Sequence, residues 1–136
     1  MCDDSTITWV HLPSVKDDRG ILTSIEARDT IPFEVKRVFY MHHIRSDRGG
    51  HAHIDTDQLV IAVAGSFKME LIDVAGRRSD WLLDDPCKGL YIPRMTFLDI
   101  KDFSLGAVCL VLASTHYDKS RSLRSLSEFK LHKVSP

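Results

Sequence analysis

Residues 58–74 read QLVIAVAGSFKMELIDV, and this stretch decides the fold class. It holds two runs rich in apolar and β-branched residues, Gln58–Ala64 and Ser66–Val74, each with the length of a strand rather than a helix. Gly65 interrupts the run, which is typical of a tight corner between two strands. Similar short runs, broken by turn residues at intervals of roughly 8–12 residues, recur along the chain and predict an all-β sandwich or barrel.

The other candidate strands share this pattern and span Thr6–Leu12, Gly20–Ala27, Glu34–His43, Gly50–Ile54, Ser79–Leu83, Gly89–Ile92, Phe97–Ile100 and Ala107–Ser114. Only Ser122–Lys130 has apolar side chains at the spacing that favours a short amphipathic helix, with Asp118 or Ser120 as its cap. The 136 residues suffice for one hydrophobic core and contain no evident linker or repeat. Residues 1–136 are therefore predicted to form a single domain.

The bulk composition argues against nucleic-acid and membrane partners. With 18 basic and 19 acidic residues, the chain has no overall field to attract a polyanion. The longest apolar runs fall far short of the roughly 20 residues that a membrane helix needs, and the first residues are acidic where a signal peptide is basic. The cysteines are three in number with no Cys-x-x-Cys pair, which favours reduced thiols and a cytoplasmic location.

The densest functional signal is Arg-Gly-Gly-His-Ala-His at residues 48–53. Side chains alternate along a strand, so His51 and His53 are expected to face one side and Ala52 the other. A His-x-His pair first suggests a metal site. However, Asp57 and Gln58 stand where metal-binding barrels of this type carry a glutamate, and the strand around Phe97 has no histidine. The sequence therefore favours a site without metal or cofactor, although a metal-dependent enzyme stays an alternative.

Without a metal, two neighbouring imidazoles suit proton transfer, because imidazole titrates near pH ~6.5. The candidate catalytic residues are His51, His53 and Tyr40. Asp57 or Asp99 is a candidate to fix the tautomer of the working ring.

A second set of residues is predicted to bind the substrate. Guanidinium groups grip phosphate oxygens in bidentate fashion, and an aromatic ring can stack on a base or sugar. The candidates are Arg19, Arg45, Arg48, Gln58, Arg94 and Phe97.

Several of these segments resemble the sugar 3,4-ketoisomerases, which act on thymidine-diphosphate-linked (dTDP-linked) 4-keto-6-deoxyglucose. The resemblance runs through Asp18–Leu22, Lys36–Tyr40, Arg48–His53, Tyr117–Asp118 and Leu123–Arg124. It implies a cupin-type jelly-roll barrel with no metal that binds a dTDP-linked sugar and forms a homodimer with exchanged N-terminal strands.

The resemblance also implies residue roles. His51 would shuttle a proton between sugar carbons 3 and 4, His53 would assist it, and Arg19 would lie near the sugar and influence product stereochemistry. Two positions depart from the relatives, where Phe39 replaces a tyrosine and Leu98 a histidine. These departures keep open a barrel that binds a nucleotide sugar without converting it.

Overall fold

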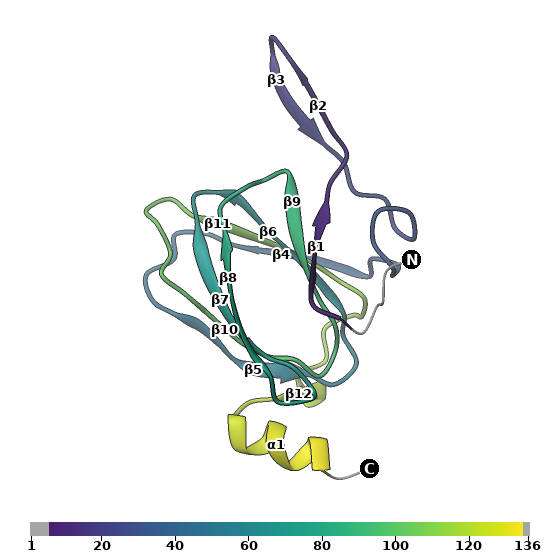
Figure 1. Ribbon diagram of the computed structural model, residues 1–136, viewed down its shortest axis with the longest axis vertical. Helices are drawn as coiled ribbons and strands as arrows, with labels where there is room; N and C mark the ends of the chain where they lie inside the picture. Colours follow the sequence, from purple (N-terminus) through teal and green to yellow (C-terminus); the bar gives the residue numbers. More distant parts are fainter. Residues whose placement is uncertain (1–5, 135–136) are drawn as a thin grey trace.

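The computed structural model describes residues 6–134, so Cys2, which enters the cysteine count, lies outside the described residues. Two five-stranded antiparallel sheets face each other around a common interior (Figure 1). The first sheet has the order β1 (Thr8–His11), β9 (Lys88–Ile92), β6 (Gln58–Ala64), β11 (Val108–Ala113), β4 (Arg37–Met41). The second has the order β12 (Ser122–Leu123), β5 (Arg48–His53), β10 (Phe97–Lys101), β7 (Phe67–Ile72), β8 (Arg78–Leu83).

Two elements lie outside these sheets, at opposite ends of the barrel in Figure 1. The strands β2 (Ser14–Asp17) and β3 (Gly20–Thr23) pair only with each other and project as a hairpin. The helix α1 (Leu126–Val134) covers the other end, next to β5 and β12. The expected all-β jelly-roll barrel with a short C-terminal helix is confirmed.

The main hydrophobic core fills the space between the sheets. Val60 and Val111 of the first sheet meet Met69, Leu71 and Leu98 of the second, and all five are at most 3% exposed. Each such side chain contributes roughly 1.5–3 kcal/mol when fully buried. This core makes the barrel rigid enough to hold polar side chains at one end.

The outer face of the first sheet is covered by the chain itself. Ile31 and Phe33, from the segment between β3 and β4, pack on Leu59, Ile61 and Tyr91. Because this segment crosses the sheet instead of extending it, the expected strands Gly20–Ala27 and Glu34–His43 are shorter, as β3 and β4.

The helix starts later than the sequence pattern indicates. Ser122 and Leu123 form the two-residue strand β12 against β5, so they are not helical. The Oγ of Ser125 accepts a hydrogen bond from the backbone N–H of Glu128 at 3.1 Å, which makes Ser125 the helix cap. Asp118, one of the expected caps, instead caps the 3₁₀ turn Lys119–Arg121.

Within residues 6–134, no helix is both long enough and apolar enough to span a membrane.

Candidate functional site

Two glycines place the histidine pair on β5. Gly49 and Gly50 have φ values of +101° and +74°, a region that favours glycine. A Cβ on Gly49 would lie 2.8 Å from the carbonyl oxygen of Leu98, so no larger residue fits there. The register against β10 pairs His51 with Leu98 but Gly49 with Asp99, which leaves Gly50 as the extra residue of a bulge. The bulge ends directly before His51 and bends the strand at the site.

The two imidazoles lie next to each other, as the alternation of side chains predicts. Their ring centroids are 4.8 Å apart and their planes meet at 79°. Ala52, between them, is fully buried on the opposite face against Phe129 of α1. The Nδ1 atom of His53 lies 3.5 Å from the Oγ of Ser122. The Nε2 atom of this ring takes no part in that contact.

The surroundings favour the neutral form of both rings. Burial lowers the pKa of His51, and the positive charges of Arg124 and Arg48 add to this, while a hydrogen bond to the Gly49 backbone opposes it. Burial also lowers the pKa of His53, to about 4, with a further contribution from His51. Both imidazoles are therefore neutral at pH 7, and a neutral imidazole has a lone pair that can accept a proton.

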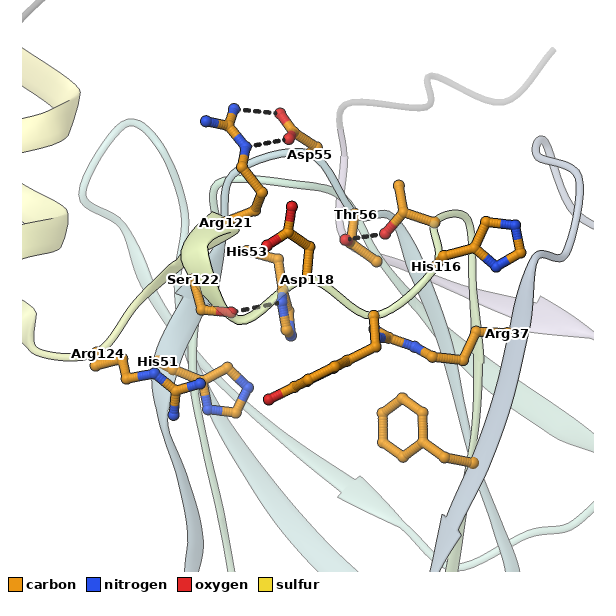
Figure 2. Close-up of a pocket in the computed structure, with 13 residues that line it drawn as sticks. Arg37, His51, His53, Asp55, Thr56, His116, Asp118, Arg121, Ser122 and Arg124 are labelled. Carbon is orange, nitrogen blue, oxygen red and sulfur yellow. Dashed lines mark hydrogen bonds and ion pairs between the residues drawn. The ribbon is translucent and has the colours of Figure 1, made fainter.

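The histidines line a cavity of about 720 Å³, here called the histidine cavity (Figure 2). Its walls come from β4, from β5 with the turn that follows it, and from the chain segment before α1. The lining residues are Arg37, Phe39, His51, His53, Asp55, Thr56, Thr115, His116, Tyr117, Asp118, Arg121, Ser122 and Arg124. This volume lies within the usual range of small-molecule sites.

A second cavity of about 390 Å³, here called the barrel cavity, lies between the two sheets. It is lined by Phe39, Met41, Asp47, Arg48, Gly49, His51, Gln58, Val60, Met69, Leu98, Ile100, Val111 and Arg124. Phe39, His51 and Arg124 line both cavities. His51 therefore lies where the two cavities meet.

The histidine cavity contains positive charge that the protein does not neutralise. Arg121 is held by Asp55 through an Nη2–Oδ1 hydrogen bond of 2.9 Å and a second bond from Nε (Figure 2). By contrast, among the described residues no carboxylate forms an ion pair with Arg37 or Arg124. The Nε of Arg37 is buried without a hydrogen-bond partner, and its guanidinium lies between the rings of Phe39 and Tyr117. Such a cavity suits an anionic ligand.

Most of the arginines that the sequence suggested lie elsewhere. Arg19 is at the tip of the β2–β3 hairpin, with its side chain 90% exposed and bound to Asp17. Arg94 is held by Asp57 through two side-chain hydrogen bonds of 3.2 and 3.0 Å. Neither of them, nor Arg45, lines the histidine cavity or the barrel cavity, whereas Arg48 lines the barrel cavity.

Strand alternation explains where the remaining candidates lie. Phe39 points into the barrel, so its neighbour Tyr40 points outward, is 62% exposed and lines neither cavity. Likewise Leu98 faces the barrel cavity, so Phe97 lies on the other face of β10. The ring of Phe97 packs against that of Phe129 in α1, with 5.8 Å between the ring centroids. Gln58 is 4% exposed and lines the barrel cavity, as a substrate-binding residue would.

The sequence reasoning missed the segment that closes the histidine cavity. The lining residues from this segment include Tyr117, Asp118, Arg121, Ser122 and Arg124, and they lie between β11 and α1, where the regular structure is the 3₁₀ turn Lys119–Arg121 and the two-residue β12. No periodic pattern marks residues 115–121, and the helical pattern over Ser122–Lys130 led to the wrong expectation for Ser122 and Leu123. Arg37 could have been found, because it shares a strand face with Phe39.

Two expected companions of the histidines have different surroundings. Asp57 binds Arg94 and is not a lining residue. Asp99, in contrast, acts on His51 through its negative charge, which opposes the lowering of the pKa of that ring. Among residues 6–134, no group of three or more histidine, cysteine, aspartate or glutamate side chains is arranged to hold a metal ion.

Comparison with known proteins identifies the family. Residues 5–134 match the family described as "FdtA: WxcM-like, C-terminal". The chain belongs to the FdtA family. A relative, the TDP-4-oxo-6-deoxy-alpha-D-glucose-3,4-oxoisomerase of Aneurinibacillus thermoaerophilus, is 33% identical over 123 residues, which are 89% of this chain and 88% of that protein.

Solved structures of 3,4-ketoisomerases have the same fold. The enzyme from Helicobacter canadensis superposes with a TM-score of 0.89 at 31% identity, over 93% of this chain and 96% of that one. A histidine-to-asparagine variant of the QdtA enzyme from Thermoanaerobacterium thermosaccharolyticum, in complex with TDP-4-keto-6-deoxyglucose, superposes with a TM-score of 0.88 at 32% identity. That match covers 93% of each chain. The fold of this chain is therefore shared with a 3,4-ketoisomerase variant that binds TDP-4-keto-6-deoxyglucose.

Proposed function

We propose that this protein is a 3,4-ketoisomerase that moves the keto group of a TDP-linked 4-keto-6-deoxyhexose from carbon 4 to carbon 3. The observation on which this rests is the neutral His51–His53 pair, in which His51 lines both cavities, in a chain whose relatives described above are 3,4-ketoisomerases. A structure of one relative holds TDP-4-keto-6-deoxyglucose, which defines the substrate class that we assign here.

The chemistry begins with proton removal. The ketone at carbon 4 acidifies the hydrogen on carbon 3, and His51 takes this proton as general base, which leaves an enediolate. The oxygen-bound proton moves from oxygen 3 to oxygen 4, and the protonated His51 then gives a proton to carbon 4, which regenerates the neutral base and completes the isomerisation. The N–H proton on this imidazolium exchanges with the solvent before it is transferred, so the product acquires deuterium at carbon 4 in deuterium oxide. Bonds and charges balance, because one C–H bond breaks and one forms. The carbonyl of the substrate accepts the electron pair, so the proposed reaction requires no cofactor. We also propose that the protein acts in the cytoplasm.

The two cavities fit the two halves of the substrate. We assign the sugar to the junction at His51, with Gln58 and Arg48 in reach from the barrel cavity. We assign the nucleotide to the larger histidine cavity, where Arg37 offers an unpaired charge to the diphosphate. The ring of Tyr117, which is 70% exposed beside Arg37, offers a surface for stacking on the base. His53 assists His51 as a neutral hydrogen-bonding partner.

We further propose a homodimer with exchanged N-terminal strands. Val15, Ile21 and Leu22 of the β2–β3 hairpin are 55–66% exposed, and a two-stranded hairpin on its own is marginally stable in water. A second copy of this chain is the occupant that would cover them. Exchange also offers Arg19, at the hairpin tip, a route to the sugar in another copy. Ile21→Asp should shift the protein toward monomer in size-exclusion chromatography with light scattering, and a monomeric wild type would contradict the dimer.

The function is tested by incubating the protein with TDP-4-keto-6-deoxyglucose in deuterium oxide and following the sugar by NMR. The proposal predicts a 3-keto product with deuterium at carbon 4. Tight binding with no exchange would instead identify a non-catalytic binding protein, the alternative that the apolar Phe39 and Leu98 suggest. Absence of both binding and exchange would reject the assignment to TDP sugars.

A further inference from the structure

The reaction proposed above creates a negative charge that the site must stabilise. When the proton leaves carbon 3, charge develops on the oxygen at carbon 4, and enzymes stabilise such oxyanions with fixed donors or cations in a site shielded from water. His53 is neutral at pH 7, and its Nδ1 faces Ser122. Neither imidazole therefore supplies a positive charge at the start of the reaction.

One arginine occupies the position that this charge requires. Arg37 and Arg121 line only the histidine cavity and Arg48 lines only the barrel cavity, whereas Arg124 lines both, as His51 does. Figure 2 shows the guanidinium of Arg124 beside the ring of His51. The two groups are close enough for the charge of Arg124 to act on His51. Arg124 is thus the cation that lies, with the proposed base, at the junction of the cavities.

The backbone around Arg124 is fixed on both sides. Immediately before it, Ser122 and Leu123 pair with His53 and Ala52 as β12. The backbone N–H of Arg124 donates to Oε2 of Glu128 at 3.0 Å, while the Glu128 N–H donates to the Ser125 hydroxyl. This reciprocal arrangement is a form of the capping box.

The helix that carries this cap is anchored in turn. Phe129 is fully buried against Phe97 and Ala52, so α1 is fixed to the back of the histidine strand. The start of α1 therefore serves to position one side chain at the cavity junction.

The positive charge of Arg124 is also available to interact with a ligand. Among the described residues, no aspartate or glutamate forms an ion pair with its guanidinium. By contrast Arg121, three residues earlier, is paired with Asp55. An unpaired guanidinium keeps its donors for a ligand.

We propose that Arg124 is a catalytic residue that binds the oxygen at carbon 4 and stabilises the enediolate, and that Glu128 positions it. The proposal rests on the ketoisomerase function assigned above. Arg124 donates hydrogen bonds to the keto oxygen in the ground state and stronger ones to the oxyanion that follows, while His51 removes the proton. The nucleotide diphosphate is left to Arg37.

Arg124→Gln tests this role, with Arg124→Lys as the variant that restores the charge. Loss of an oxyanion-stabilising group lowers kcat by about 100-fold or more. We expect this loss in Arg124→Gln, partial recovery in Arg124→Lys, and a Kd for TDP, measured by calorimetry, that changes by less than about threefold in both. Arg77→Gln, at an exposed turn that lines neither cavity, is the matched control. Circular dichroism and Tm establish that each variant is folded.

Two results would overturn the proposal. If Arg124→Gln keeps its kcat while the Kd for TDP rises, Arg124 is a diphosphate ligand. If neither quantity changes, it has no role in the site. Glu128→Ala, which removes the acceptor for the Arg124 N–H, should lower kcat less than Arg124→Gln and leave the Kd for TDP unchanged, and an unaltered kcat would remove Glu128 from the proposal. A wild type that shows no proton exchange would reject the proposed function instead, so the two failures are distinct.

Discussion

The depressed pKa of His53 makes the folded protein sensitive to mild acid. The pKa is about 4 in the folded protein, whereas the ordinary value, which applies to the unfolded chain, is 6.5. Between these values the unfolded state binds more protons than the folded state, so stability is full above pH 6.5 and is lost as the pH falls toward 4. From pH 7 to pH 5 this one group lowers the free energy of unfolding by about 2 kcal/mol.

Urea denaturation at pH 7 and pH 5 measures this contribution. His53→Gln removes the titrating ring, so the variant should lose about 2 kcal/mol less than the wild type between the two pH values. The difference between the proteins isolates His53 from carboxylates that titrate in both. His132→Gln, a similar change on an exposed part of α1, should keep the wild-type loss. Equal losses in wild type and His53→Gln would refute the reasoning that burial holds this imidazole neutral.

Three further predictions follow from the structure. Phe129→Ala should destabilise the protein by about 3–5 kcal/mol, because its ring is fully buried between α1 and the barrel, and a thermal melt with an unchanged Tm would contradict this packing. As the pH is lowered, kcat/KM should begin to decrease only below pH 6.5, because the pKa of His51 is lowered. A decrease that begins above pH 6.5 would show that the base is not this ring. Thiol labelling followed by mass spectrometry should leave Cys109 unmodified in the folded protein, because burial raises the pKa of its thiol to about 12, and rapid modification would contradict its placement in the core.

Strand alternation was the part of the sequence signal that could be trusted. It predicted that His51 and His53 share a face, and both rings line one cavity in the structure. The same rule, applied to β4 with Phe39 facing inward, would have directed Tyr40 to the outside. The strands between the two sheets also followed from short apolar runs bounded by turn residues, since those runs reflect burial between two sheets. The strands β2 and β12 were not predicted, because β2 is exposed and β12 has only two residues.

The chain that closes the cavity could not be predicted in the same way. Residues 115–121 have no repeating pattern, and Ser122 and Leu123 form β12 instead of the expected helix. The places of these residues depend on contacts made across the fold, such as Arg121 with Asp55 and Ser122 with His53. Arg19, Arg45, Arg48 and Arg94 were predicted to bind the substrate because guanidinium groups bind phosphate oxygens. The structure instead uses Arg94 to hold Asp57 and places Arg124, more than seventy residues after His51, beside that ring.

Phe39 and Leu98 set the character of the space around the proposed base. Leu98 lies opposite His51 in the β10–β5 register and lines the barrel cavity, and Phe39 lines both cavities. Neither side chain offers a hydrogen bond, so in the proposed function the polar contacts to the sugar come from His51, His53, Arg48, Gln58 and Arg124. In the proposed function, the reacting groups of the protein are therefore on β5, whereas Phe39 of β4 and Leu98 of β10 provide apolar surface.

The role of His51 is tested most directly by hydrogen exchange in His51→Asn. With TDP-4-keto-6-deoxyglucose in deuterium oxide, the wild type should transfer deuterium to carbon 4 of the product. His51→Asn should lower the exchange rate by at least about 100-fold while it still binds TDP, because only the general base has been removed. Exchange by His51→Asn at the wild-type rate would contradict the assignment of His51 as the base.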